Sequence, residues 1–149
     1  MRSRIRNLKR IRPYHGAGML FYHRDPHENV HILLGRRISR PGLGKWSVPG
    51  GGYESDDGIM MGRRDYRSTA IRETSEEIAR SVTDCSLIWR LHLPGFHWEL
   101  FSTESEDMNI PNYNCEFSQM SWFPIAELPS DTLFLIKNQV ASLRRSLHS

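Results

Sequence analysis

The segment Arg72-Glu73-Thr74-Ser75-Glu76-Glu77 carries most of the information about fold and chemistry in this sequence of 149 residues. On a helix, its three glutamates stand at i, i+3 and i+4 and therefore share one face. Like charges at this spacing destabilise an isolated helix by roughly a few tenths of a kcal/mol per pair, which favours a bound cation. Hard divalent ions such as Mg²⁺ prefer carboxylate oxygen. Taken alone, however, an acidic helix is more often only a solvated face.

The residues around this segment predict a helix that packs on a sheet. Asp65 is suited to cap the N-terminus of the helix, which is predicted to run to about Arg80. Ile71, Thr74 and Ile78 form the predicted inward face.

A glycine-rich stretch, Trp46-Ser47-Val48-Pro49-Gly50-Gly51-Gly52, lies upstream of the predicted helix. Glycine permits positive φ values and lets the backbone approach a ligand or an ion closely. Taken alone, such a stretch is an ordinary turn. Followed by an Arg-Glu-x-x-Glu-Glu helix, it is far less generic.

The rest of the chain alternates short apolar runs with polar loops, which predicts one α/β or α+β domain. The predicted strands cover residues 17–22, 30–35, 85–93, 98–102 and 117–124, and residues 103–114 are predicted to form a loop. A last amphipathic helix is predicted to begin at a Ser130 cap, with apolar positions at Leu133, Ile136, Val140, Leu143 and Leu147.

These features resemble the signature of Nudix hydrolases. The family pattern is Gly, five residues, Glu, seven residues and Arg-Glu-U-x-Glu-Glu-x-Gly-U, where U is bulky and aliphatic. Gly51 matches the first glycine, and residues 72–77 match the core of the pattern. Residues 33–37, 46–51 and 122–129 also look like the family, so the likeness runs from about residue 17 to the final helix. It implies an α/β (α+β) fold, namely a Nudix-type α/β/α sandwich around a mixed β-sheet.

The sequence departs from this signature at several positions. The spacer between Gly51 and Arg72 is seven residues longer than the pattern, and we place the extra residues at 58–64. Asp57 stands where the first glutamate would be. Thr74 replaces an aliphatic residue of the signature, Ala79 replaces its closing glycine, and Arg80 replaces the aliphatic residue after that glycine. The carboxylates that are expected to bind metal are retained. We interpret the segment as a divergent but catalytically competent signature, with an inactive site as the alternative.

The resemblance implies a metal-assisted hydrolysis. Mg²⁺, or Mn²⁺, is expected to be held by Glu73, Glu76, Glu77 and the carbonyl oxygen of Gly50. The ion would neutralise diphosphate charge and orient a water for in-line attack on phosphorus. Arg72 is expected to hold the carboxylates or the glycine loop through its planar guanidinium group.

The identity of the general base is left open by the resemblance. The candidates are Glu116, which lies six residues before Trp122, and Glu73. The rival acids on the same predicted loop are Glu104, Glu106 and Asp107. Glu54 and Asp57 are expected at most to support the metal ligands.

The resemblance implies that a nucleoside diphosphate linked to another group is cleaved. We expect a small nucleotide of the NTP, dNTP or nucleotide-sugar type, with Arg36 and Arg37 as candidate phosphate-binding residues. Two alternatives remain: a nucleotide-binding regulatory module without turnover, and an RNA 5′-end pyrophosphohydrolase. Trp98, Phe96 and Tyr113 could stack on a base, although aromatic residues near strands belong more often to the core.

Composition limits the class of protein. Six of the 20 Lys and Arg residues lie in the first twelve positions, so residues 1–16 are interpreted as a basic arm and residues 17–149 as one mildly acidic domain. The arm is most simply a solvated terminus, although it could touch nucleic acid or act as a transit peptide. The chain has two cysteines, too few for a disulfide framework, and this favours a cytoplasmic protein. No apolar run is long enough to cross a bilayer, so we expect no membrane contact. Homodimerisation is compatible with the family resemblance.

Overall fold

The protein is described here by a computed structural model that covers residues 13–114 and 116–148. Most of the predicted basic arm lies outside these residues. The strands are β1 (Tyr14–Arg24), β2 (Val30–Arg37), β3 (Trp46–Ser47), β4 (Gly50–Gly52), β5 (Ile59–Met60), β6 (Arg63–Arg64), β7 (Ser86–Leu93), β8 (Phe96–Glu104) and β9 (Phe117–Pro124). The helices are the short 3₁₀ helix η1 (Ser55–Asp57), α2 (Tyr66–Ile78) and α3 (Ile136–Leu147).

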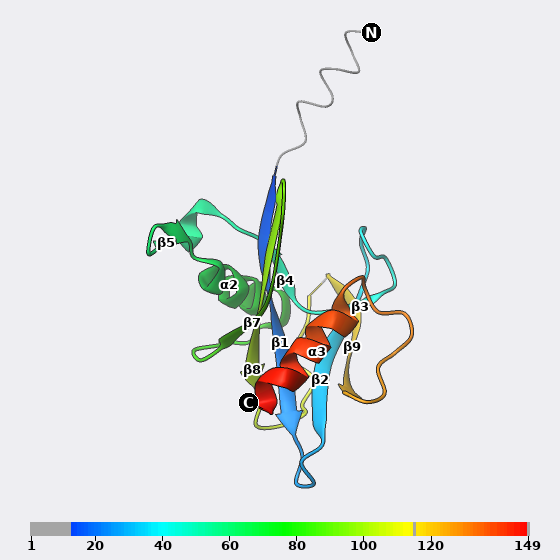
Figure 1. Ribbon diagram of the computed structural model, residues 1–149. Helices are drawn as coiled ribbons and strands as arrows, with labels where there is room; N and C mark the ends of the chain where they lie inside the picture. Colours follow the sequence, from blue (N-terminus) through cyan, green and yellow to red (C-terminus); the bar gives the residue numbers. More distant parts are fainter. Residues whose placement is uncertain (1–12, 115, 149) are drawn as a thin grey trace.

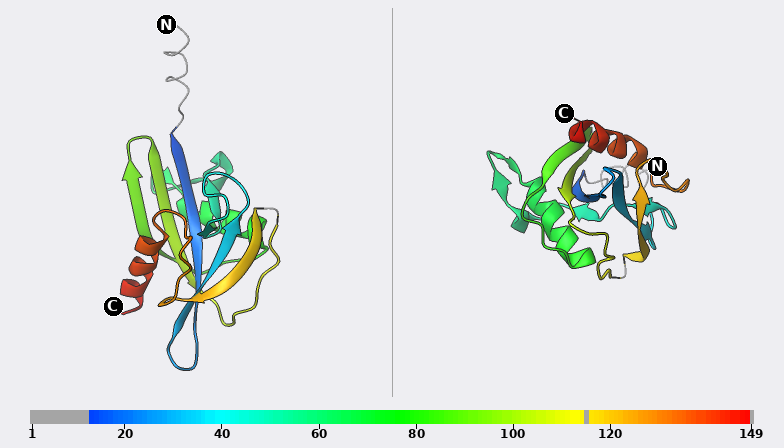
Figure 2. Two further views of the ribbon diagram at one scale, coloured as in Figure 1. Left: turned by 90° about the vertical axis from the view of Figure 1, so that its right-hand side faces the viewer. Right: turned by 90° about the horizontal axis from the view of Figure 1, so that it is seen from below.

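A mixed sheet forms the centre of the fold (Figure 1). Its strands follow the order β3-β2-β1-β8-β7, while β4 pairs with β1 and β9 pairs with β2. The pairing of β1 with β8 is parallel, and the other pairings in this sheet are antiparallel. Helices α2 and α3 lie on different sides of the sheet (Figure 2). The predicted α/β/α sandwich around a mixed sheet is confirmed.

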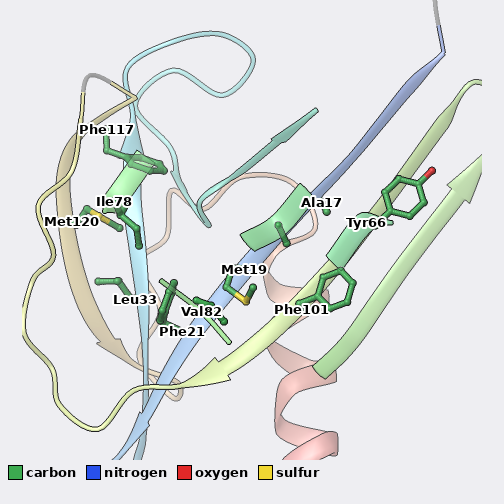
Figure 3. Close-up of a cluster of buried hydrophobic side chains, with 11 residues drawn as sticks. Ala17, Met19, Phe21, Leu33, Tyr66, Ile78, Val82, Phe101, Phe117 and Met120 are labelled. Carbon is green, nitrogen blue, oxygen red and sulfur yellow. The ribbon is translucent and has the colours of Figure 1, made fainter. Parts of the chain in front are cut away.

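Alternating side chains of β1 supply both halves of the core, because successive residues of a strand point to opposite faces. Ala17, Met19 and Phe21 pack with side chains of α2, in the cluster drawn in Figure 3. Leu20 packs on the other face in a cluster with Ile136, Val140 and Leu143 of α3. The two helices are thus held on the sheet by separate apolar clusters.

Helix α2 begins and ends close to its predicted limits. The Asp65 side chain caps it by accepting a hydrogen bond from the Ser68 N–H (3.1 Å). Thr74 and Ile78 are fully buried, as predicted, and Ile71 is partly buried against the same cluster. Thr74 is tolerated there because its hydroxyl donates to the Ala70 carbonyl oxygen (2.7 Å).

The end of α2 carries a strained residue. Ala79 has the left-handed conformation (φ 52°, ψ 37°) at the position of the signature's closing glycine. We expect Ala79→Gly to raise the free energy of unfolding by about 1 kcal/mol, because glycine adopts positive φ without a Cβ clash. Urea unfolding measures the change. Ala141→Gly, an exposed position inside α3, is the matched control and should lower stability by about 1 kcal/mol. A loss of stability in Ala79→Gly would contradict the prediction.

The longer spacer forms a structure that the sequence reading did not predict. Residues 59–64 fold into a separate two-stranded hairpin, β5–β6, in which Ile59 pairs with Arg64 and Met60 with Arg63. The hairpin lies beside α2 and away from the main sheet (Figure 1). It extends the region between η1 and α2 without disturbing the sheet.

The predicted start of the last helix is wrong. Helix α3 begins at Ile136, after Leu135 in a left-handed conformation, and Ser130 does not cap it. The preceding segment instead lies along β3, since the Trp46 N–H donates to the Asp131 carbonyl oxygen (3.0 Å) and the Leu133 N–H donates to the Trp46 carbonyl oxygen (2.8 Å). These strand-like hydrogen bonds exclude a helical conformation there.

Candidate active site

A cavity of about 680 Å³ brings together acidic side chains from two distant segments. Glu73 and Glu77 enter it from α2, and Glu116 enters it from the loop before β9. Gly50 and Gly51 of β4 line the same cavity. Of the acids proposed as general base, the rivals Glu104, Glu106 and Asp107 do not line it.

The two glycines are required by the close packing of β4. A Cβ atom at Gly51 would lie 2.5 Å from the Glu73 carboxyl carbon. A Cβ atom at Gly50 would lie 2.5 Å from the Ala17 carbonyl oxygen. The backbone of β4 therefore packs closely between β1 and the acidic face of α2, whereas the sequence suggested a close approach to a ligand or an ion.

Arg72 connects the carboxylates to the glycine strand. Its guanidinium group forms a two-pronged contact with Asp57, in which Nε donates to Oδ1 (2.6 Å) and Nη2 donates to Oδ2 (3.0 Å). Nη1 donates to Glu73 Oε1 (3.0 Å) and Glu76 Oε2 (3.2 Å), and Nη2 also donates to the Gly52 carbonyl oxygen (2.9 Å). The expected structural role of Arg72 agrees with these contacts, because the fixed guanidinium plane limits the rotamers of its partners.

Asp57 is the buried anchor of this arrangement, although the sequence suggested only a supporting role. Its side chain is 3% exposed and accepts further hydrogen bonds from the Thr69 hydroxyl (2.8 Å) and the Glu54 N–H (2.9 Å). Burial acts to raise the pKa of Asp57, but the hydrogen bonds from Arg72, Glu54 and Thr69 outweigh it and lower the pKa. Asp57 therefore stays ionised and holds Arg72 in place.

Glu77 has the most perturbed carboxyl group of the site. Burial, together with the nearby negative charges of Glu73 and Glu116, raises its pKa to about 8. A hydrogen bond from the Gly50 N–H to Oε2 (3.2 Å) opposes this shift without cancelling it. The carboxyl group thus lies in a strongly negative environment that a cation would stabilise.

This shift predicts how the stability of the metal-free protein depends on pH. A raised pKa means that the folded state holds the Glu77 proton more tightly than the unfolded state. The free energy of unfolding should therefore fall as pH rises from about 4.5, the ordinary value, to about 8. Urea unfolding at pH 5 and pH 8, in the presence of a chelator, measures the loss. We expect a smaller loss in Glu77→Gln, and equal losses in both proteins would contradict the assignment.

The other predicted site residues are divided between the cavity and its surroundings. Arg37 lines the cavity, whereas Arg36 lies outside it and donates to Asp131 (3.0 Å). Adjacent residues of β2 point to opposite faces, which explains the difference. Glu76 also lies outside the lining, and its side chain is 58% exposed and bonded to Arg72. The ligand role of Glu76 has no direct support from this arrangement.

Asn114 positions the loop that carries Glu116, and the sequence reading missed it. Its backbone N–H donates to the Glu77 carbonyl oxygen and its side chain donates to the Glu76 carbonyl oxygen (both 2.9 Å). Its Oδ1 accepts a hydrogen bond from the Glu116 N–H (2.9 Å). Asn114 thus fastens Glu116 to the end of α2, through contacts that no local pattern indicates.

An aromatic wall faces the acidic part of the cavity. Tyr14 stacks on Phe96 and Trp98, with ring centroids 5.8 and 6.4 Å apart, and all three residues line the cavity. Trp98 and Phe96 were candidates for base stacking, whereas the third candidate, Tyr113, is not part of the lining. Phe134 adds a side chain that is 82% exposed.

Gln139 of α3 brings an unused hydrogen-bond acceptor to this wall. The residue is 6% exposed and lines the cavity, and within the described part of the chain its Oε1 is the one buried side-chain polar atom without a partner. A buried acceptor without a partner is costly, which favours a ligand that donates to it. A glutamine between Ile136 and Val140, on the apolar face of the helix, was the signal available in the sequence.

The chemistry of the donors suits a hard divalent ion. Glu73, Glu77 and Glu116 provide carboxylate oxygens in one cavity, which is the donor type that Mg²⁺ and Mn²⁺ prefer. The described residues contain no group of three His, Cys, Asp or Glu side chains already arranged to hold a metal ion.

None of the described helices has the length and hydropathy required for a membrane span.

Comparison with known proteins agrees with this arrangement. Residues 14–145 match the family model described as NUDIX domain. The chain is similar to the Nudix domain of Shewanella oneidensis NrtR, solved with ADP-ribose (TM-score 0.71, 16% identity, 90% of this chain and 88% of that one). It is similar to a Nudix hydrolase from Nitrosomonas europaea (TM-score 0.66, 25% identity, 92% and 71%) and to an Ap4A hydrolase binary complex from C. elegans (TM-score 0.61, 17% identity, 89% and 98%). No curated protein matches the sequence.

Proposed function

The chain belongs to the Nudix family of hydrolases acting on phosphoric anhydride bonds, and we propose from this premise that it is a divalent-metal-dependent pyrophosphohydrolase of small nucleotides. The observation that carries the proposal is one cavity that holds both an acidic end and an aromatic end. The acidic end suits a metal-bound diphosphate, and the aromatic end suits a base.

Glu73, Glu76 and Glu77, with the carbonyl oxygen of Gly50, are the proposed ligands of Mg²⁺ or Mn²⁺. When bound, the ion would supply charge neutralisation of the diphosphate and activation of water. Arg72 holds Glu73 and Glu76 in their rotamers through the hydrogen bonds described above. Glu77 and Glu73 are the ligands with the strongest support, since both line the cavity.

Glu116 is the better of the two candidates for the general base. Glu73 accepts a hydrogen bond from Arg72 Nη1 (3.0 Å), so one of its carboxylate oxygens is already engaged. Glu116 lines the same cavity, and no Lys or Arg of the described residues forms an ion pair with it. We propose that Glu116 takes the proton from the attacking water.

The aromatic end of the cavity is proposed to bind the nucleotide base. Tyr14, Trp98 and Phe134 offer ring faces for stacking, and Gln139 Oε1 offers an acceptor for an amino or imino group. Arg37 is the proposed phosphate contact, because it lines the cavity while Arg36 does not. ADP-ribose, which is bound in one similar structure, and Ap4A, after which a second similar hydrolase is named, carry both a base and a diphosphate or longer phosphate chain.

A phosphate-release panel tests the proposed function. The purified protein would be incubated with Mg²⁺ or Mn²⁺ and NTPs, dNTPs, ADP-ribose, nucleotide sugars, dinucleoside polyphosphates and 5′-triphosphate RNA, with a coupling phosphatase or pyrophosphatase. We expect metal-dependent turnover of one class of small nucleotide. Turnover confined to RNA would replace the proposed substrate class. Nucleotide-induced thermal shifts without any turnover would replace the enzyme with a binding module.

A further inference from the structure

A second cavity, of about 920 Å³, lies on the α2 side of the sheet and shares no lining residue with the acidic cavity. Its walls come from the β5–β6 hairpin, the first turn of α2 and the β7–β8 pair. Its charged and polar lining residues include His15, Ser55, Arg63, Arg64, Arg90 and His97. His15 faces this cavity while its neighbour Tyr14 faces the other one, because adjacent strand residues point to opposite faces.

The longer spacer builds one wall of this cavity. The hairpin contributes Arg63 and Arg64, and its base is fixed at Gly58, whose carbonyl oxygen accepts hydrogen bonds from the Tyr53 hydroxyl (2.7 Å) and the Asp65 N–H (3.0 Å). A chain with the shorter spacer of the signature would lack this wall. The cavity is therefore a feature of this chain's own insertion.

Positive charge exceeds negative charge around the cavity. Arg63, Arg64 and Arg90 line it, and among the described residues the one carboxylate in ion-pair contact with them is the buried Glu99. Glu99 lies 3.5 Å from both Arg63 and Arg90, which is an ion-pair contact without a short hydrogen bond. Within the described residues, Arg64 has no carboxylate in ion-pair range, and its guanidinium carbon lies over the Tyr53 ring at 5.5 Å.

Histidines complete the polar lining. His97 is buried and joins Glu99 (2.7 Å) to His92 (3.0 Å), and the His15 ring contacts the Tyr66 hydroxyl (3.1 Å). Burial lowers the pKa of His15, and the neighbouring charges of Arg64, His97 and His92 lower it further. The same surplus of positive charge that disfavours a protonated His15 would favour a bound anion.

We propose that this second cavity, which is separate from the acidic cavity, binds a small anion through its phosphate group. Guanidinium groups form strong and directional contacts with phosphate oxygens, and three arginines line this cavity. Ser55 and the histidines offer further donors around them. The inference is independent of the proposed function, because the two cavities have no residue in common.

Calorimetric titration tests the proposal on the full chain in a chelating buffer, which keeps metal out of the acidic cavity. The probes are inorganic phosphate, diphosphate and ADP, with adenosine as the uncharged control. We expect the anions to bind and adenosine not to bind. Similar affinity for diphosphate and ADP assigns the site to a free anion, whereas a preference for ADP assigns it to a nucleotide phosphate. Equal binding of adenosine and ADP would overturn the proposal.

Substitutions then locate the binding. Arg64→Ala leaves the contacts of Glu99 intact and should weaken diphosphate binding by about tenfold, as should Arg63→Ala. Arg24→Ala, on the far end of β1 beside Glu104, is the matched control and should bind like the unaltered protein. Thermal melting checks that each variant is folded. Unchanged affinity in Arg64→Ala and Arg63→Ala, or no anion binding by the unaltered protein, would overturn the proposal.

Discussion

Glu77→Gln should lower the turnover number by at least about 10²-fold while the fold is retained. Glutamine keeps an oxygen that can accept the hydrogen bond from the Gly50 N–H, so the packing of β4 on α2 survives. It removes the negative charge that metal binding requires. Loss of metal-assisted charge stabilisation costs several kcal/mol in the transition state, and each 1.4 kcal/mol is about tenfold in rate. Steady-state kinetics with Mg²⁺ on the substrate found in the panel measures the effect.

Two comparisons make the Glu77 result specific. Glu127→Gln changes an exposed glutamate in the turn after β9 and should leave the turnover number unchanged. Raising the Mg²⁺ concentration should restore part of the activity of Glu77→Gln, if weaker metal binding is the cause. Activity equal to that of the unaltered protein would remove Glu77 from the proposed ligands.

Arg72→Ala should have the largest effect on stability, lowering the free energy of unfolding by about 3 kcal/mol. The substitution leaves Asp57 buried and ionised without its two-pronged partner, and an uncompensated buried charge is strongly destabilising. It also frees Glu73 and Glu76, so turnover should fall as well. Urea unfolding at neutral pH measures the stability change.

A double-mutant cycle with Asp57→Ala identifies the cause of that loss. If the buried pair is responsible, the double variant should be less destabilised than the sum of the two single variants. Arg67→Ala, on the same helix, removes an exposed hydrogen bond to the Thr83 carbonyl oxygen (2.9 Å) and a contact with the Cys85 thiol, and should change stability by less than about 0.5 kcal/mol. Additive effects of the Arg72 and Asp57 substitutions would contradict the role of the pair.

Elements with strong local signals were predicted well. Helix α2 ends two residues before the predicted limit, because the Asp65 cap and the spacing of its buried residues are encoded within one segment. Strand β9 covers the predicted residues 117–124. Strand β1 starts at Tyr14, three residues before the predicted run, since pairing with β8 extends it beyond its apolar core.

Two elements were predicted poorly. The predicted cap of α3, Ser130, lies five residues before the observed cap, Leu135, because the segment after Ser130 forms hydrogen bonds with Trp46 in place of helical ones. The hairpin β5–β6 has no alternation of apolar residues that would have indicated it, and its side chains are exposed. The start of α3 could not be read from the local sequence, since propensity is a weak guide where tertiary contacts decide.

The sequence by itself determined that three glutamates share one face of a helix and that a glycine-rich stretch precedes them, because helix periodicity and backbone freedom are local properties. It did not determine how their environments differ. Packing of β4 and the Glu116 loop over α2 buries Glu77 and raises its pKa, while Glu76, one residue away, remains exposed. Tertiary structure alone decided this difference, because desolvation and the field of neighbouring charges depend on segments far apart in the chain.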